Sequence, residues 1–298
     1  MEIVLDHRGE AAALAAASAW ALAAVFFRKL GAQFTPIQLN LYKGLLALAM
    51  LIATLLLTGD LWNDIPTRAW LLLLASGALG IGLGDTCYFA ALNRVGVRYA
   101  LIMETMAPPI AALLAWLFLR DLLPMRAWFG IAVVGAGLAW VILERSPAGA
   151  TNQVMTRAGF AFGALAASAQ AGGAVLSHAA LTLTDVSPMW SAVIRLLAGI
   201  GLLPLLLLRR GATKTPATPK ETTSNTWLWL AGATLVGTYL GLWLQQVSLK
   251  YTSAGIAQTL LVTSPVFGLA IAKWQGEHVS LRALIGVMVV IGGVALIF

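Results

Sequence analysis

The sequence predicts an all-α membrane protein with ten transmembrane helices, arranged as two five-helix repeats of inverted topology around a central cavity. Three observations predict this fold. Hydrophobic residues make up 60% of the 298 residues, charged residues make up only 10%, and the mean hydropathy is +0.86, values far outside those of soluble domains. Apolar stretches recur along the whole chain, and landmarks of the first half return in the second. This composition excludes a soluble enzyme.

Ten segments have the length and composition of membrane spans. A helix needs about 20 mostly apolar residues to cross a hydrocarbon core of about 30 Å. Charges, prolines and turn residues separate the segments, and the alternating pattern of a membrane β-barrel is absent. The expected spans are Ala11–Gly31, Ile37–Leu57, Ala69–Leu92, Arg98–Leu119, Arg126–Leu143, Ala158–Ala179, Pro188–Leu208, Trp227–Leu249, Ala254–Trp274 and Leu281–Phe298.

The two halves of the chain repeat each other in sequence, which predicts repeats over residues 1–150 and 151–298. The matched pairs include Gly80 with Gly237, Gly84 with Gly241, Pro108 with Pro265, Lys43 with Arg195, and Trp20 with Gln170. Each half holds five spans, an odd number. The second half therefore enters the membrane upside down relative to the first, as in transporters built from inverted repeats.

These landmarks resemble the EamA family of the drug/metabolite transporter superfamily over nearly the whole chain. The first unit carries Tyr88-Phe-Ala-Ala-Leu92, Tyr99-Ala100, Pro108, Leu119-Arg120-Asp121, Gly130 and Gly137. The second carries Leu249, Ala254, Pro265, Gly276-Glu277, Gly286 and Gly293 in the same order. The first unit departs from the pattern at Arg120, where a glycine is expected. The resemblance implies a ten-helix carrier in the bacterial cytoplasmic membrane, with a central cavity that moves small metabolites, often outward.

Four ionisable residues lie well inside the expected spans: Lys43, Asp85, Glu104 and Arg195. Such groups are costly at membrane depth, so they mark pathways or internal pairs. At 1.5 Å per helical residue, the first three each lie about 10 Å from the same membrane face, and Arg195 lies about 10 Å from the opposite face. Lys43, Asp85 and Glu104 are therefore expected at one level.

Two interpretations of these charges remain open. In the first, they line the cavity and bind the carboxylate and amine of a zwitterion, or exchange a proton with it. In the second, a structural pair such as Lys43 with Glu104 neutralises both charges. Asp85 and Glu104 align with Leu242 and Leu261, so the acids are not part of the repeated scaffold. We therefore expect the two acids to bind the substrate or a proton. The two cations are expected either to contact an anionic group of the substrate or to pair with the acids.

Polar and aromatic residues give further candidates for the cavity wall. The candidate substrate-contacting residues are Gln170, Gln245, Gln246 and Gln258, and the candidate aromatic wall is Trp20, Tyr88, Tyr99 and Trp243. The alternative roles are hydrogen bonding between helices for the glutamines and anchoring at the lipid interface for the aromatic residues.

The matched glycines and prolines are expected to shape the helices. The four glycines permit close packing of the spans that carry them. Pro108 and Pro265 each remove a backbone hydrogen bond in mid-span, so each should kink its helix. Matched kinks at related positions suit gating.

The expected function is a secondary carrier for a small organic metabolite, such as an amino acid or a similarly amphipathic compound, and export is the expected direction. An integral membrane enzyme and a lipid flippase are the alternatives. The sequence has no HExxH, GxSxG or phosphate-binding loop, which argues against an enzyme and excludes an ATP-driven pump in this chain. His7, His178 and His278 lie far apart in sequence, and Cys87 is the single cysteine. No metal site or cofactor is expected.

The expected partners are the lipid bilayer and a small-molecule substrate, with protons left open as a coupling ion and a monomer as the assembly. The formal net charge is +7, but the basic residues form no run interleaved with aromatic residues, so nucleic acid is not expected. Five Lys and Arg residues fall on the side of the chain ends and twelve on the other side. This count places both termini outside, whereas the family resemblance implies both in the cytoplasm.

Overall fold

The computed structural model describes residues 7–30, 33–34, 36–62, 64–144, 156–209, 224–276 and 279–298, and this part of the chain is helical with no strand. The first half contains α2 (Arg8–Leu30), α3 (Pro36–Thr58), η1 (Asp60–Trp62), α4 (Thr67–Gly77), η2 (Ala78–Gly84), α5 (Asp85–Glu104), α6 (Ala107–Leu119) and α7 (Met125–Glu144). The second contains α8 (Arg157–Leu183), α9 (Pro188–Arg209), α10 (Ser224–Thr234), η3 (Leu235–Leu240), α11 (Gly241–Tyr251), α12 (Ala254–Leu261), α13 (Ser264–Trp274) and α14 (Leu281–Ile297).

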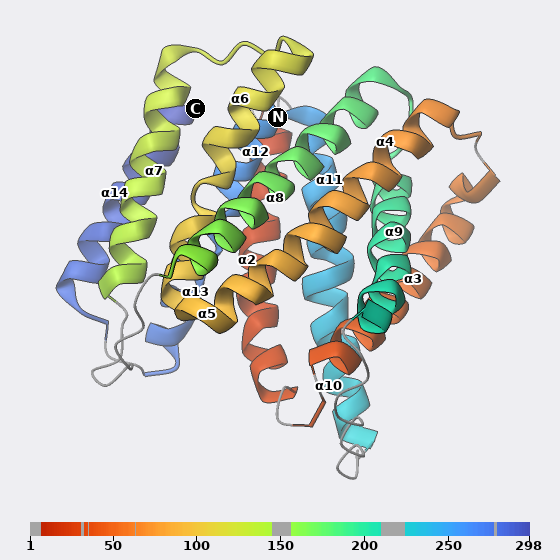
Figure 1. Cartoon of the computed structure of the whole chain (residues 1–298), viewed down its shortest axis with the longest axis horizontal. Coiled ribbons are helices and arrows are strands. Elements are labelled where there is room, and N and C mark those ends of the chain that lie inside the picture. The colour runs from red at the N-terminus through yellow and green to blue at the C-terminus, as the bar shows by residue number, and fades with distance from the viewer. Residues whose placement is uncertain are drawn as a thin grey trace.

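Eight helical stretches among the described residues are long and apolar enough to cross a membrane, so the chain is a multi-pass membrane protein. The other two expected spans contain shorter apolar helices, Pro188–Leu202 and Leu281–Ile297. The described residues thus give eight full-length candidates where ten were expected. The His7 and Phe298 rings lie 5.2 Å apart, so both described chain ends lie at the same end of the bundle, here called the terminal end (Figure 1).

Two helical spans are broken immediately before their matched prolines. Helix α5 ends at Glu104 and α6 begins at Ala107, while α12 ends at Leu261 and α13 begins at Ser264. A proline ring clashes with the carbonyl four residues earlier. For Pro108 and Pro265 that carbonyl belongs to Glu104 and Leu261, which are the last residues of the two interrupted helices.

Two other spans carry a turn of π-helix at their glycine motifs. The segment η2 lies within a continuous helical path from α4 to α5, and η3 lies between α10 and α11. Their backbones keep right-handed helical angles on both sides. Such π-turns are rare and occur frequently at functional sites.

The first helix of each half packs against the other half. Helix α2 contacts α10, η3, α11, α12 and α13, whereas α8 contacts α4, η2, α5 and α6. Both helices consequently run through the middle of the molecule (Figure 1). The two halves interlock and do not form separate globular domains.

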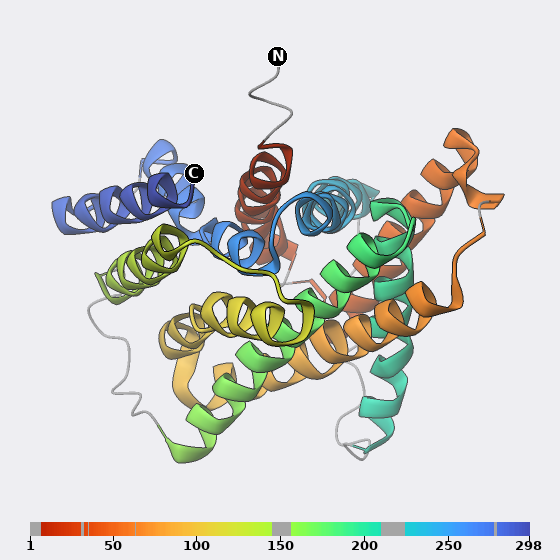
Figure 2. The same cartoon turned by 90° about the horizontal axis from the view of Figure 1, so that it is seen from above.

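Helices α7 and α14 pack along each other at one edge of the molecule (Figures 1 and 2). Glycines on both helices make the close approach possible, since an added β-carbon would meet the facing helix at 2.7 or 2.8 Å. The contacts are Gly130 with Ile297, Gly137 with Val290, Gly286 with Val141, and Gly293 with Val134.

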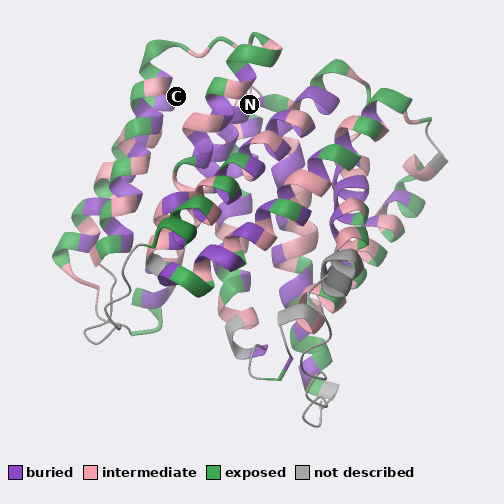
Figure 3. Ribbon diagram, viewed as in Figure 1, coloured by how far each residue is buried: buried purple, intermediate pink, exposed green. Residues whose placement is uncertain are grey.

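Small residues dominate the buried interior, and large apolar residues point outward. Alanines at 0% exposure recur in the core of α2, α8 and α12, which allows the helices to approach closely. Outward-facing apolar residues include Leu57, exposed at 89%, and Trp274, exposed at 85%. Buried and exposed residues alternate around the outer helices (Figure 3). This distribution is expected for a bundle surrounded by lipid.

The connections after α6 and α13 each contain a residue with a left-handed backbone conformation. Arg120 has φ 54° and Gly276 has φ 86°. Only glycine adopts this region without a steric penalty, which explains the glycine that the resemblance led us to expect. In the first half, Arg120 takes the same conformation at a cost.

Candidate functional site

A cavity of about 190 Å³ lies between the two helix breaks. The breaks contribute Glu104, Thr105, Ala107, Leu261, Val262, Ser264 and Pro265 to its wall. The rest of the wall comes from other helices and comprises Trp20, Leu101, Ile142, Gln170, Gln245 and Gln258. The cavity is therefore placed where both spans lose their regular backbone hydrogen bonding.

Positions that the sequence repeat pairs face each other across this cavity. The lining includes both members of the pairs Trp20 with Gln170, Leu101 with Gln258, Glu104 with Leu261, Thr105 with Val262, and Ala107 with Ser264. Each half thus supplies its first helix and its broken helix. The backbone positions are matched, but the side-chain chemistry is not.

Glu104 is the single ionisable side chain among the described residues that line the cavity. It is the last residue of α5 and is partly buried. No described side chain or backbone N–H forms a hydrogen bond or an ion pair with its carboxylate. The nearest charged influence on it is a second acid, Asp85. An acid without a compensating partner at this depth is available for a ligand.

The other three membrane-embedded charges form a separate group, here called the charged group: Lys43, Asp85 and Arg195. Both cations lie within electrostatic range of Asp85. None of the three lines the cavity. No ion pair of 4.0 Å or less joins either cation to Asp85 or Glu104, all four being described residues. The Lys43–Glu104 pair considered from the sequence is therefore not formed, and the expected set of four charges is divided.

Two glutamines connect the cavity wall to the charged group. Gln170 Nε2 donates a hydrogen bond to Asp85 Oδ1 at 3.1 Å. Arg195 Nη1 donates to Gln245 Oε1 at 3.2 Å. Arg195 is only 2% exposed, and its Nε has no hydrogen-bond partner. The glutamine amides thus lie between the cavity and two charged groups, the buried Arg195 guanidinium and the partly buried Asp85 carboxylate.

The remaining expected site residues lie outside the cavity wall. Gln246 is fully buried and accepts a hydrogen bond from Ser191 Oγ at 2.7 Å. This hydrogen bond joins α11 to α9. The Tyr88 ring lies edge-on to Phe89, with centroids 5.9 Å apart. Tyr99 and Trp243 are likewise absent from the described lining.

The glycine motifs pack against the first helix of the opposite half. A β-carbon on Gly84 would lie 3.4 Å from Gln170 Nε2, and one on Gly80 would lie 3.6 Å from Gln170 Oε1. In the other half, a β-carbon on Gly241 would overlap the Trp20 indole. The same two matched residues, Trp20 and Gln170, therefore contact a glycine motif and also line the cavity.

Gly237 repeats this arrangement one turn earlier, where a β-carbon would overlap Ala23. Gly173, the residue matched to Ala23, lies close to Gly80. The π-turns thus lie at close contacts between the interlocked halves.

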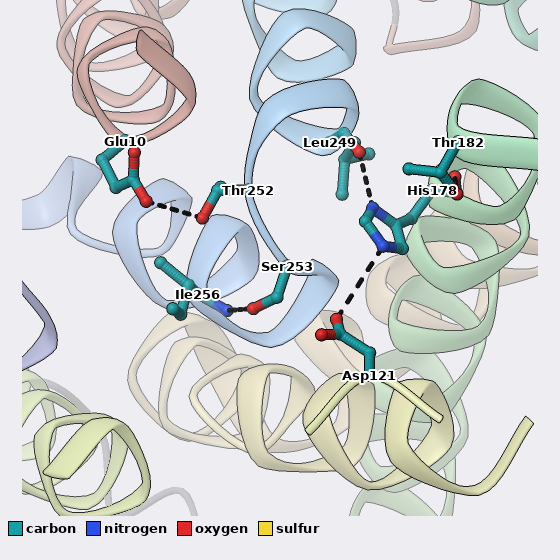
Figure 4. Close-up of polar contacts among 8 residues, drawn as sticks. All are labelled: Glu10, Asp121, His178, Thr182, Leu249, Thr252, Ser253 and Ile256. Atoms are coloured by element: carbon teal, nitrogen blue, oxygen red, sulfur yellow. Dashed lines mark hydrogen bonds and ion pairs between the residues drawn. The ribbon is translucent and has the colours of Figure 1, made fainter. Parts of the chain in front are cut away.

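The terminal end is tied together by polar contacts that the sequence did not predict (Figure 4). His178 Nδ1 donates to the Leu249 carbonyl oxygen at 2.6 Å, and His178 Nε2 lies 3.8 Å from Asp121 Oδ2. Thr252 Oγ1 donates to Glu10 Oε1 at 2.7 Å. These contacts join α2, α8, α11 and the connection after α6. A histidine inside an apolar span was the available signal, because it is costly there without a partner.

Thr105 and Ser264 are two further lining residues that sequence reasoning missed. Each lies within three residues of its matched proline, at the helix break. Hydroxyl residues beside a helix-breaking proline were the available signal, because the backbone groups that lose their helical hydrogen bonds need other polar partners.

Together, the spanning helices and the polar cavity between broken helices define a multi-pass membrane transporter. The EamA-like transporter family matches residues 7–143 and again residues 157–298. The chain therefore belongs to the EamA-like transporter family. This membership indicates a transporter rather than an enzyme.

One relative and one solved structure are also similar to this chain. The chain is 31% identical over 128 residues to an "Uncharacterized transporter in cobO 3'region" of Sinorhizobium sp, which covers 42% of this chain and 89% of that protein. A solved crystal structure aligns with a TM-score of 0.77 over 97% of this chain and 95% of its own, at 18% identity. That likeness shows a shared fold.

Proposed function

We propose that this protein is a secondary carrier that moves a small organic solute through the cavity by alternating access. The observation that carries the proposal is the position of the cavity between two helices broken at matched prolines. Carriers built from inverted repeats bind their substrates near the membrane midplane, at discontinuous helices between the repeats. Amino acids and amines of similar size are the solutes that we propose.

The proposal includes two inverted repeats over residues 1–150 and 151–298, which together form ten spans. Reciprocal contacts between α7 and α14 support it. Gly130 contacts Ile297, while its counterpart Gly286 contacts Val141, the counterpart of Ile297. Reciprocity of this kind is the signature of a two-fold relation. The separate family matches to each half give independent support.

In the proposed cycle, the polar contacts at the terminal end hold that end shut while the solute exchanges from the other end. Opening the terminal end requires separating His178 from Asp121 and Glu10 from Thr252. The helix breaks and π-turns supply the backbone freedom for this rearrangement, since hinges absorb their changes at a few residues.

We further propose that the carrier exports its solute across the cytoplasmic membrane of a bacterium, with a solute or proton gradient as the driving force. The sequence has no phosphate-binding loop, and the relative named above is bacterial. Glu104 and Asp85 are the candidate proton-binding groups. A reporter fused after Phe298 determines on which side of the membrane the terminal end lies.

Counterflow in proteoliposomes tests the proposal. Vesicles loaded with unlabelled phenylalanine or phenethylamine are diluted into a trace of the radiolabelled compound. We expect transient accumulation of unaltered label for at least one of them, with empty vesicles as the control. A chemically altered product, lipid scrambling without solute exchange, or no exchange of either compound would contradict the carrier.

A further inference from the structure

The polar groups of the described cavity wall are one carboxylate and several uncharged donors and acceptors, with no cation beside them. Glu104 is the one ionisable residue of the described lining, which contains no lysine, arginine or histidine. Lys43 Nζ lies 5.5 Å from the centroid of the Phe27 ring, and both embedded cations are grouped around Asp85. A negative solute group would therefore find no cationic partner among the described residues that line the cavity.

Hydrogen bonds fix which end of each glutamine is left for a ligand. Gln170 must donate through Nε2, because its partner Asp85 offers only acceptors. Its Oε1 remains as an acceptor without a partner among the described residues. Gln245 must accept through Oε1, because Arg195 has only donors. Its Nε2 remains as a donor.

The cavity thus offers one carboxylate, the free amide oxygen of Gln170, the uncharged polar groups of Thr105, Gln245, Gln258 and Ser264, and one aromatic face. An ammonium group needs acceptors for its N–H bonds, and a hydrogen bond between an ammonium and a carboxylate is about twice as strong as one between neutral groups. Trp20 adds the aromatic face, which packs against apolar groups and also attracts cations. The Gln245 amide can meet a neutral acceptor on the solute.

The size of the cavity limits the solute. A dry protein cavity of about 150 Å³ accommodates benzene. A cavity of about 190 Å³ therefore suits one ring, or an apolar group of that size, with a short chain.

We propose that the cavity selects small organic ammonium ions, with Glu104 as the counter-ion and Trp20 against the apolar part. This inference rests on the proposed carrier function and narrows its substrate class. Amines bind better than their parent amino acids, because the additional carboxylate meets Glu104 and no cation.

Calorimetric binding to the purified full chain in detergent, at pH 7, tests this inference with three probes that share a phenyl ring. Phenethylamine is a cation, phenylalanine is a zwitterion and 2-phenylethanol is neutral. We expect phenethylamine to bind about tenfold to hundredfold more tightly than either of the other two, the range for a hydrogen bond to a charged group. Detergent removes the complication that amines permeate bilayers.

The variant Glu104→Gln should lower phenethylamine affinity to that of 2-phenylethanol and leave the neutral probe unchanged. Asp185→Asn is the matched control, because it removes one exposed carboxylate away from the cavity. Glu104→Asp, which keeps the charge, should retain the order of the three probes.

Equal or tighter binding of phenylalanine by the parent protein would overturn the inference, as would an unchanged order in Glu104→Gln. Phenylalanine counterflow under those circumstances would leave the carrier function intact. Failure of all three probes to bind also overturns the inference, whereas the carrier itself fails only when counterflow is absent.

Discussion

The two helix breaks have the same backbone and different chemistry. Each lies three residues before a proline, and each faces the same cavity. The first presents Glu104 and the second presents Leu261 at the matched position. The repeat therefore explains how the cavity is built. The asymmetric residues explain what the cavity can bind.

The largest effect is expected from making the two breaks alike. The variant Glu104→Leu gives the first break the side chain of the second. Because the only carboxylate among the described lining residues is lost, we expect counterflow of a transported amine to fall by about 30-fold or more, as for a central binding residue. Leu261→Met, a volume-conserving change at the other break, should retain most activity. Equal losses in both variants would mean that the breaks do not differ in the way proposed.

The matched glycines sharpen the comparison at a second pair of positions. A β-carbon on Gly241 overlaps the Trp20 indole, whereas one on Gly84 meets its nearest atom at 3.3 Å. We expect Gly241→Ala to lower the free energy of unfolding by about 1–3 kcal/mol, the range for overpacking. Gly84→Ala should cost less, because its nearest neighbours, the Leu79 carbonyl oxygen at 3.3 Å and the Gln170 amide at 3.4 Å, leave more room for a β-carbon.

Denaturant unfolding in mixed detergent micelles measures both changes. Gly292→Ala is the control, because a β-carbon there has nothing within 4 Å. Equal costs at Gly84 and Gly241 would show that the Trp20 contact is not the limiting one.

The sequence predicted positions along each helix better than it predicted which helices lie beside one another. Depth along a helix follows from 1.5 Å per residue, so the spans and the breaks at Pro108 and Pro265 were predictable. Which helices become neighbours is decided by tertiary packing. The sequence therefore led us to expect all four embedded charges around the cavity, with Arg195 at a different depth, whereas the packing of the helices brings Gln170 to the cavity wall and Arg195 beside Gln245.

The terminal end offers a third comparison, because Asp121 follows the broken helix of the first half. Asp121→Asn removes the charge that faces His178 at 3.8 Å and should loosen that end by at most about 1 kcal/mol, the upper value for a solvent-accessible ion pair. Hydrogen exchange of the amides from Leu249 to Ile256 should accelerate by up to about fivefold. Asp185→Asn serves as the control. Unchanged exchange would show that the contact does not hold this end closed.

The smallest effect is expected where the halves differ at the left-handed residue. Arg120 is exposed and adopts φ 54°, whereas Gly276 takes the matched position. Replacing Arg120 with glycine removes the steric penalty, and we expect a gain of about 1 kcal/mol in unfolding free energy. Calorimetric melting of the purified variant measures the gain. A lower melting temperature would show that the Arg120 side chain matters more than its backbone.

Solute protection of introduced cysteines tests the cavity most directly. In a Cys87→Ala background, Thr105→Cys and Ser264→Cys place one thiol at each break, and Thr182→Cys provides an exposed position outside the cavity. Saturating phenethylamine or phenylalanine should slow maleimide labelling at 105 and 264 and leave labelling at 182 unchanged. Labelling rates unaffected by either compound at both breaks would contradict a shared solute site between the halves.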